Sequence, residues 1–144
     1  MNDKHLKFLN KLVYQTQKSN IYWIDLITFT EDEDIGERLP KFKYILWQDT
    51  WHTIDYASSY ITFTDNFIAL VLTEIVDSGS DYAVLKNGKS KFHDYNVYIA
   101  KNSESEPYQL ALSNTSVQIL ISTIQKSENI PSELDKIIDD FIND

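Results

Sequence analysis

Apolar residues recur at helical spacing near both ends of the chain. The first stretch predicts a helix over 3–19, capped by Asp3, whose buried side carries Leu6, Leu9, Leu12 and Val13. Near the other end, the side chains of 113–115 offer N-cap oxygens ahead of an apolar stripe of Val117, Leu120, Ile121 and Ile124. A further short helix is predicted from Pro131, with a buried side formed by Leu134, Ile137, Ile138 and Phe141.

The middle of the chain is rich in aromatic and β-branched residues, which favour strands. Strands are predicted at 42–47, 53–64, 67–72, 95–100 and 108–112, and 21–27 is either a short strand, which we favour, or an apolar strap. The alternation in 53–64 slips at 57–59, which indicates a bulge. Asp65-Asn66 separates two β-rich runs and predicts a tight hairpin. The run 67–72 is apolar on both faces, as in a central strand covered on both sides.

Polar stretches separate these elements. The acidic run 31–34, followed by Gly36 and Pro40, is predicted to be a solvated loop, because calcium loops place their ligands at alternate positions rather than contiguously. A loop at 77–81 and a turn at Asn87-Gly88 are also predicted. The order of elements predicts an α+β fold with an N-terminal helix, a largely antiparallel sheet of about four to six strands and two C-terminal helices. We expect residues 1–144 to form a single domain.

Charge narrows the classes of partner. The net charge is −9, from 22 acidic and 13 basic residues, and Arg38 is the only arginine. A nucleic-acid partner is disfavoured, because phosphate binding and base readout favour basic patches and arginine forks. The longest apolar run, 67–72, is too short to cross a membrane, and the N-terminus lacks the apolar stretch of a signal peptide. Cysteine is absent, so we expect a cytoplasmic protein without disulfides.

The sequence carries no specific catalytic motif. With three glycines, no Gly-rich nucleotide loop can be assembled locally, and we expect no cofactor and no metal site. The alternative is a small hydrolase, or a ligand- or metal-binding domain, whose site is assembled by the fold from distant residues. Its candidates are His52, Asp55 and His93, since a carboxylate beside a histidine fixes the tautomer and raises its basicity.

Aromatic and acidic residues suggest a protein-binding surface instead. Trp47 and Trp51 flank a predicted turn, and tryptophans concentrate in binding hot spots. The last predicted helix would present a negative side suited to a basic groove, through Glu133, Asp135, Asp139 and Asp140. Our leading hypothesis is therefore a small acidic protein-binding module with a basic protein partner. A homo-oligomer with a purely structural role is a third hypothesis.

The two ends of the chain also resemble a known group of proteins. The segments 16–23 (TQKSNIYW) and 108–115 (YQLALSNT), together with many Lys, Ile and Asn residues, are similar to small orphan proteins of phages and conjugative elements in low-G+C Gram-positive bacteria. This resemblance implies an accessory protein that acts through another protein, and it assigns no site.

Overall fold

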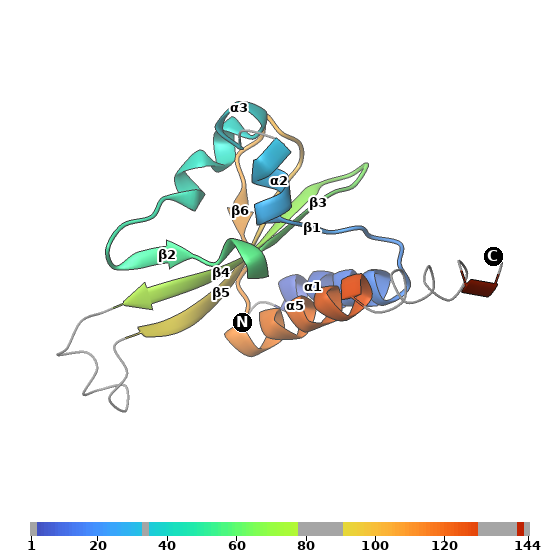
Figure 1. The fold of residues 1–144 in the computed structure, drawn as a ribbon. Helices are drawn as coiled ribbons and strands as arrows, with labels where there is room; N and C mark the ends of the chain where they lie inside the picture. Colours follow the sequence, from blue (N-terminus) through green and yellow to red (C-terminus); the bar gives the residue numbers. More distant parts are fainter. Residues whose placement is uncertain (1–2, 33–34, 78–90, 130–140, 143–144) are drawn as a thin grey trace.

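A computed structural model describes residues 3–32, 35–77, 91–129 and 141–142. It is an α+β structure, which confirms the predicted fold class (Figure 1). The elements are, in order, α1 (Asp3–Gln17), β1 (Ile24–Asp25), α2 (Leu26–Asp32), α3 (Ile35–Arg38), η1 (Pro40–Leu46), β2 (His52–Ile54), η2 (Tyr56–Ser58), β3 (Tyr60–Phe63), β4 (Ile68–Asp77), β5 (Lys91–Ala100), β6 (Tyr108–Gln109) and α5 (Asn114–Asn129), with η denoting a 3-10 helix. No helix in the described ranges is long and apolar enough to cross a membrane.

The sheet is built around β4. This strand pairs with β5 along its whole length, from Ile68 opposite Ala100 to Asp77 opposite Lys91. Its other edge is shared, because β3 pairs with the first part of β4 and β2 pairs with residues 74–76. The short strands β1 and β6 extend the sheet beside β3 and β5, and every pairing is antiparallel.

Apolar side chains of β4 pack on both faces of the sheet, as the sequence predicts for 67–72. Ala69 and Val71 join the core formed with α1 and α5, whereas Leu70 and Leu72 join a second core formed with α2 and η1. We call these sides the α1/α5 face and the η1 face. Figure 1 shows α1 and α5 side by side against one side of the sheet, with α2 and α3 on the other side.

Local sequence signals for three elements are confirmed. The first helix spans Asp3–Gln17, and Thr64 N donates to Phe67 O at 2.9 Å, which closes the β3–β4 hairpin around Asp65-Asn66. At the start of α5, Ser113 Oγ accepts from Ser116 N at 3.2 Å, as an N-cap does. The predicted stripe of α5 is buried: Val117, Leu120, Ile121 and Ile124.

Four other predictions require correction. The strand predicted at 42–47 is wrong, because Pro40–Leu46 is the 3-10 helix η1, with Phe42 and Ile45 buried three residues apart. The acidic loop predicted at 31–34 begins inside α2, which continues to Asp32, and Gly36 lies within α3. The bulge predicted at 57–59 is a 3-10 turn, η2, that divides the segment into two strands. Only Ile24–Asp25 of 21–27 form a strand, since Thr28 N donates to Asp25 Oδ1 at 2.7 Å and a helix follows.

The second C-terminal helix predicted from Pro131, most of the 77–81 loop and the Asn87-Gly88 turn lie outside the described residues.

Candidate functional site

Three large aromatic side chains are exposed on one short segment that runs from η1 to the start of β2. Tyr44, Trp47 and Trp51 are 58%, 53% and 56% exposed, and we call them the aromatic patch. Tyr44 faces outward because η1 buries Phe42 and Ile45 on its other side. At Trp47 the backbone becomes extended and the 3-10 helix ends. The structure therefore places both tryptophans that the sequence singled out on the surface.

The turn that carries the tryptophans is held by side chain–backbone hydrogen bonds. Asp49 Oδ1 accepts from Trp51 N at 2.7 Å and from His52 N at 2.8 Å, while Asp49 N donates to His52 O at 2.8 Å. Gln48 Oε1 accepts from Ile54 N at 2.9 Å, which joins the turn to β2. Short polar side chains that bond to the backbone two or three residues on fix turns in this way. The backbone of the turn between Trp47 and His52 is thus fixed by hydrogen bonds within the protein.

His52 connects the aromatic patch to the sheet. Its ring stacks on Trp47 with centroids 4.4 Å apart, and its Nδ1 lies 3.2 Å from Trp47 O. Its Nε2 lies 2.7 Å from Glu74 Oε1. A carbonyl oxygen only accepts, and so does an ionised carboxylate. Both hydrogen bonds together therefore need a proton on each ring nitrogen of His52, or a proton on Glu74.

Glu74 is the buried centre of a polar network on the η1 face. The residue is only 8% exposed, and its Oε2 accepts from Asn96 Nδ2, whose Oδ1 in turn accepts from Gln109 Nε2 at 2.7 Å. Strand register explains the grouping: Glu74 is opposite Asp94 on β5, and Asn96 lies two residues further along the same face. Burial of a carboxylate is tolerated when its oxygens are hydrogen-bonded, as they are here.

No local pattern in the sequence predicts this network. Its members lie on four strands and face the same side only because of their register: His52, Glu74, Asn96 and Gln109. One signal was available, since Glu74 is an acidic residue in the direct continuation of the apolar run 67–72. A buried acid in such a strand requires partners on its neighbours.

Tyr98 lies at the border of the same network. Burial, followed by the negative charges of Glu74 and Asp94 and the nearby Tyr44, raises the pKa of Tyr98 from 10.0 to about 12. The phenol is therefore a hydrogen-bond donor over the whole ordinary pH range. Its environment favours a neutral or positively charged neighbour over an additional anion.

The raised pKa of Tyr98 predicts a loss of stability in strong base. The unfolded chain releases this proton near pH 10 and the folded protein releases it near pH 12, so stability falls between these values. Because the side chain is only partly buried, we expect a loss of at most about 2 kcal/mol. Urea unfolding at pH 9.5 and at pH 11.5 should show that the free energy of unfolding falls less between these two pH values for Tyr98→Phe than for the wild type. Equal losses in the two proteins would contradict this assignment.

The residues of the alternative site do not meet at one place. His93 is opposite Ile75 on the α1/α5 face, where a cleft of about 400 Å³ is lined by Asp55, His93, Tyr95 and side chains of α5. His52 lies on the η1 face, bonded to Glu74. They are separated because His52 is opposite Val76 and His93 is opposite Ile75, and adjacent residues of a strand face opposite sides of the sheet. Asp55 also has a structural contact, since its Oδ1 accepts from Ala57 N at 3.1 Å and caps η2.

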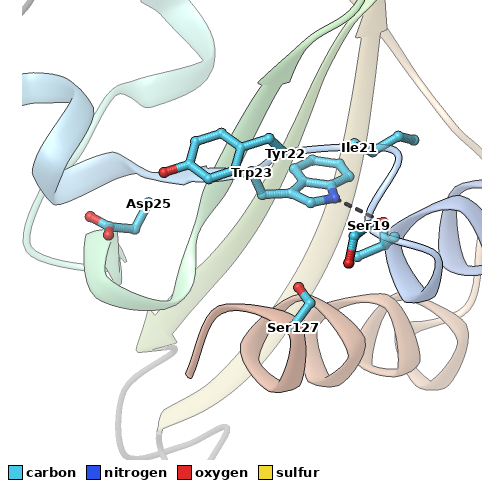
Figure 2. A pocket seen from close by; sticks show the side chains of 7 residues that line it. Ser19, Ile21, Tyr22, Trp23, Asp25 and Ser127 are labelled. Carbon is cyan, nitrogen blue, oxygen red and sulfur yellow. Dashed lines mark hydrogen bonds between the residues drawn. The ribbon is translucent and has the colours of Figure 1, made fainter. Parts of the chain in front are cut away.

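A second hollow lies between the end of α1, the segment leading into β1 and α5 (Figure 2). It has a volume of about 360 Å³, with Trp23, Tyr22, Asp25 and Ser127 in its lining. Trp23 is buried and its Nε1 donates to Thr16 Oγ1 at 3.0 Å, and both oxygens of Asp25 accept from Thr28. The principal polar groups of this hollow thus already have hydrogen-bond partners within the protein, so few of them are available to a ligand.

The acidic residues predicted to bind a partner near the C-terminus lie outside the described residues: Glu133, Asp135, Asp139 and Asp140. Among the residues that are described, no three His, Asp or Glu side chains are grouped closely enough to hold a metal ion.

Fold and site together define an α+β protein with an exposed aromatic patch next to a His–Glu–Asn network whose glutamate is buried. Comparison with protein-family models, with curated proteins and with solved structures gives no match to the chain.

Proposed function

We propose that this protein is a binding module that engages a basic segment of a protein partner through the aromatic patch. The observation that carries the proposal is the exposure of both Trp47 and Trp51 on a turn fixed by Asp49. Exposed tryptophans on a fixed backbone give a large contact area at a small entropy cost on binding. Single exposed apolar residues are common, but three aromatic side chains on one eight-residue segment (44–51) favour a contact surface.

Electrostatics support a basic partner. The net charge of −9 attracts cations at long range, and Asp49 on the turn provides a local carboxylate beside the tryptophans. Tryptophan is the preferred aromatic partner of Lys and Arg in cation–π contacts. A Lys- or Arg-rich segment thus combines ring contacts with salt bridges, and its association is faster at low salt. The resemblance to accessory proteins of phages and conjugative elements supports the same role, since such a protein acts through another protein.

The experiment is an affinity purification from a lysate of the organism that encodes the protein, at low and moderate salt, with quantitative mass spectrometry. We expect a stoichiometric basic protein that is depleted as the salt concentration rises. Changing Trp47 and Trp51 to Ala should weaken its binding at least about 10-fold, because hot-spot tryptophans contribute about 2 kcal/mol or more. Tyr14 and Tyr108, which are exposed elsewhere, provide the matched control as the Tyr14→Ala, Tyr108→Ala double variant.

Two outcomes would contradict the proposal: equal retention of the partner by the Trp double variant and the wild type, or a captured protein that has no basic segment. An eluate without a stoichiometric partner would also count against it.

A small-ligand domain is the second candidate function. It is favoured by one observation, the presence of Asp55 and His93 in the lining of the same cleft beside α5. Hydroxyl and amide groups of Ser58, Ser122 and Gln125 line it as well, which suits a polar ligand. A thermal-shift screen of metal ions and polar metabolites, with His93→Ala as the comparison, tests this candidate.

A further inference from the structure

One side of helix α1 is positively charged in this acidic protein. Residues 3–18 contain four lysines and one acid, Asp3, so the segment has a net charge of +3 in a chain whose net charge is −9. Helical geometry continues to the end of this segment, because Lys18 N donates to Tyr14 O at 3.1 Å. The lysines are three, four and seven residues apart, which places them on one side of the helix, and all are exposed; we call them the lysine stripe: Lys4, Lys7, Lys11 and Lys18.

Most of the lysine stripe has no carboxylate partner. Among the described residues, no ion pair involves Lys7, Lys11 or Lys18. Lys18 lies instead over the ring of Tyr14, with its Nζ 5.5 Å from the ring centroid, and this ring is 52% exposed. Like charges three or four residues apart on a helix repel each other. The chain has 22 acidic residues, yet in the described ranges none of them neutralises these three lysines.

The backbone beneath the lysine stripe is fixed by packing. The other side of α1 is buried at Leu9, Leu12 and Thr16, and α1 packs against α5. Thr16 Oγ1 donates to Leu12 O at 2.7 Å and accepts from Trp23 Nε1 at 3.0 Å, which secures the end of the helix. A partner therefore meets positive charges at the regular spacing of a helix, and it does not have to order this backbone on binding.

The distribution of charge favours a narrow partner. Since residues 3–18 have a net charge of +3, the rest of the chain has a net charge of −12. A membrane or a nucleic-acid duplex is broad and would bring its own negative charge close to this acidic remainder. A single acidic segment contacts the lysine stripe alone, and charges more than about 8 Å away are largely screened at physiological ionic strength. Phosphate recognition also favours arginine, and the only arginine of the chain, Arg38, lies on α3.

We propose that the lysine stripe is a docking surface for an acidic segment of a protein partner, with carboxylates that recur every three or four residues. Lys7, Lys11 and Lys18 pair with these carboxylates, and the exposed ring of Tyr14 adds apolar contact area between them. Helix α1 packs on the opposite face of the sheet from η1, on which the aromatic patch begins (Figure 1). This docking surface is therefore independent of the proposed binding of a basic segment.

The test is a titration of the ¹⁵N-labelled full-length protein with a synthetic alanine-rich helical peptide that carries glutamates three or four residues apart. We expect saturable shifts of the amide signals of 7–18, and we expect the affinity to fall as sodium chloride is added. The triple variant Lys7→Gln, Lys11→Gln, Lys18→Gln should weaken binding at least about 10-fold, because three exposed ion pairs of ordinary strength together account for that factor.

A second triple variant is the matched control: Lys41→Gln, Lys43→Gln, Lys101→Gln. It removes the same charge from exposed positions outside α1 and should retain most of the affinity. The proposal is overturned if the peptide does not shift the α1 amides. It is also overturned if the two triple variants weaken binding equally, because net charge would then explain the result.

Parallel titrations with vesicles of phosphatidylserine and phosphatidylcholine in equal parts, and with a DNA duplex, test the other anionic partners. Tighter binding of either than of the peptide overturns the choice of an acidic protein segment. The Trp47→Ala, Trp51→Ala double variant should bind the peptide as the wild type does. A failure of the aromatic patch to bind a basic segment is thus distinguishable from a failure of the lysine stripe.

Discussion

Replacing Glu74 with alanine is expected to lower the free energy of unfolding by about 1–3 kcal/mol, the usual cost of leaving buried hydrogen-bonding groups without a partner. The variant leaves His52 Nε2 without its carboxylate partner, and Asn96 Nδ2 keeps only the longer contact of 3.4 Å with Asp94 Oδ2. Both side chains of the pair are largely buried, at 13% and 10% exposure, so water replaces the lost partner poorly. Chemical denaturation of the two proteins at neutral pH measures the difference.

Glu106→Ala is the matched control for this prediction. Glu106 pairs with Lys41 at 3.6 Å, but both side chains are about half exposed, and surface pairs contribute at most about 1 kcal/mol. A double-mutant cycle of Glu74→Ala with His52→Ala should also give a coupling energy above that of Glu106 with Lys41. If Glu74→Ala costs no more than Glu106→Ala, the network does not hold the aromatic patch to the sheet.

Phe42→Ala is expected to destabilise the protein by about 3–5 kcal/mol, because it empties a fully buried ring position on the η1 face. Tyr44→Ala on the same 3-10 helix removes an exposed ring and should change the stability by less than about 0.5 kcal/mol. Urea unfolding of both variants gives the comparison. It also distinguishes the two conformations of the segment, since a strand would place Phe42 and Tyr44 on one face. Similar costs for the two variants would contradict the 3-10 helix.

Local sequence was sufficient to predict an element where the spacing of its apolar residues continued without interruption. The stripe from Val117 to Ile124 needed only the helical repeat, and Ser113 supplied its cap. The Asp65-Asn66 hairpin followed from turn chemistry, and the burial of β4 on both faces followed from an uninterrupted apolar run. Each of these elements is determined by residues close to it in the chain.

Tertiary packing determined the secondary structure of the segments for which local sequence left two alternatives or predicted the wrong element. The residues of 42–47 have strand composition, yet burial of Phe42 and Ile45 three residues apart requires a 3-10 helix, which Pro40 starts. Composition does not report which residues the rest of the fold will cover. The propensity of a short segment was therefore overridden.

Only part of the candidate site could be predicted, because local sequence does not report the tertiary packing and strand register that bring distant residues together. Trp47 and Trp51 could be singled out as surface residues because they flank a predicted turn, and both are exposed. The separation of His52 from His93 depends on the registers in which β2 and β5 pair with β4, which are not visible in local sequence. The partnership of His52 with Glu74 spans 22 residues and has no local signal at all.

The shared edge of β4 also sets an order of assembly. The β3–β4 hairpin closes around a two-residue turn, so its pairing forms early at a small entropy cost. Strand β2 precedes β3 in the chain but pairs with residues 74–76, in the last part of β4. His52 can therefore meet Glu74 only once that part of β4 is present. The turn that carries the tryptophans thus reaches its final position only after the far half of β4 is in place. We therefore expect an incompletely folded chain not to present the proposed binding surface.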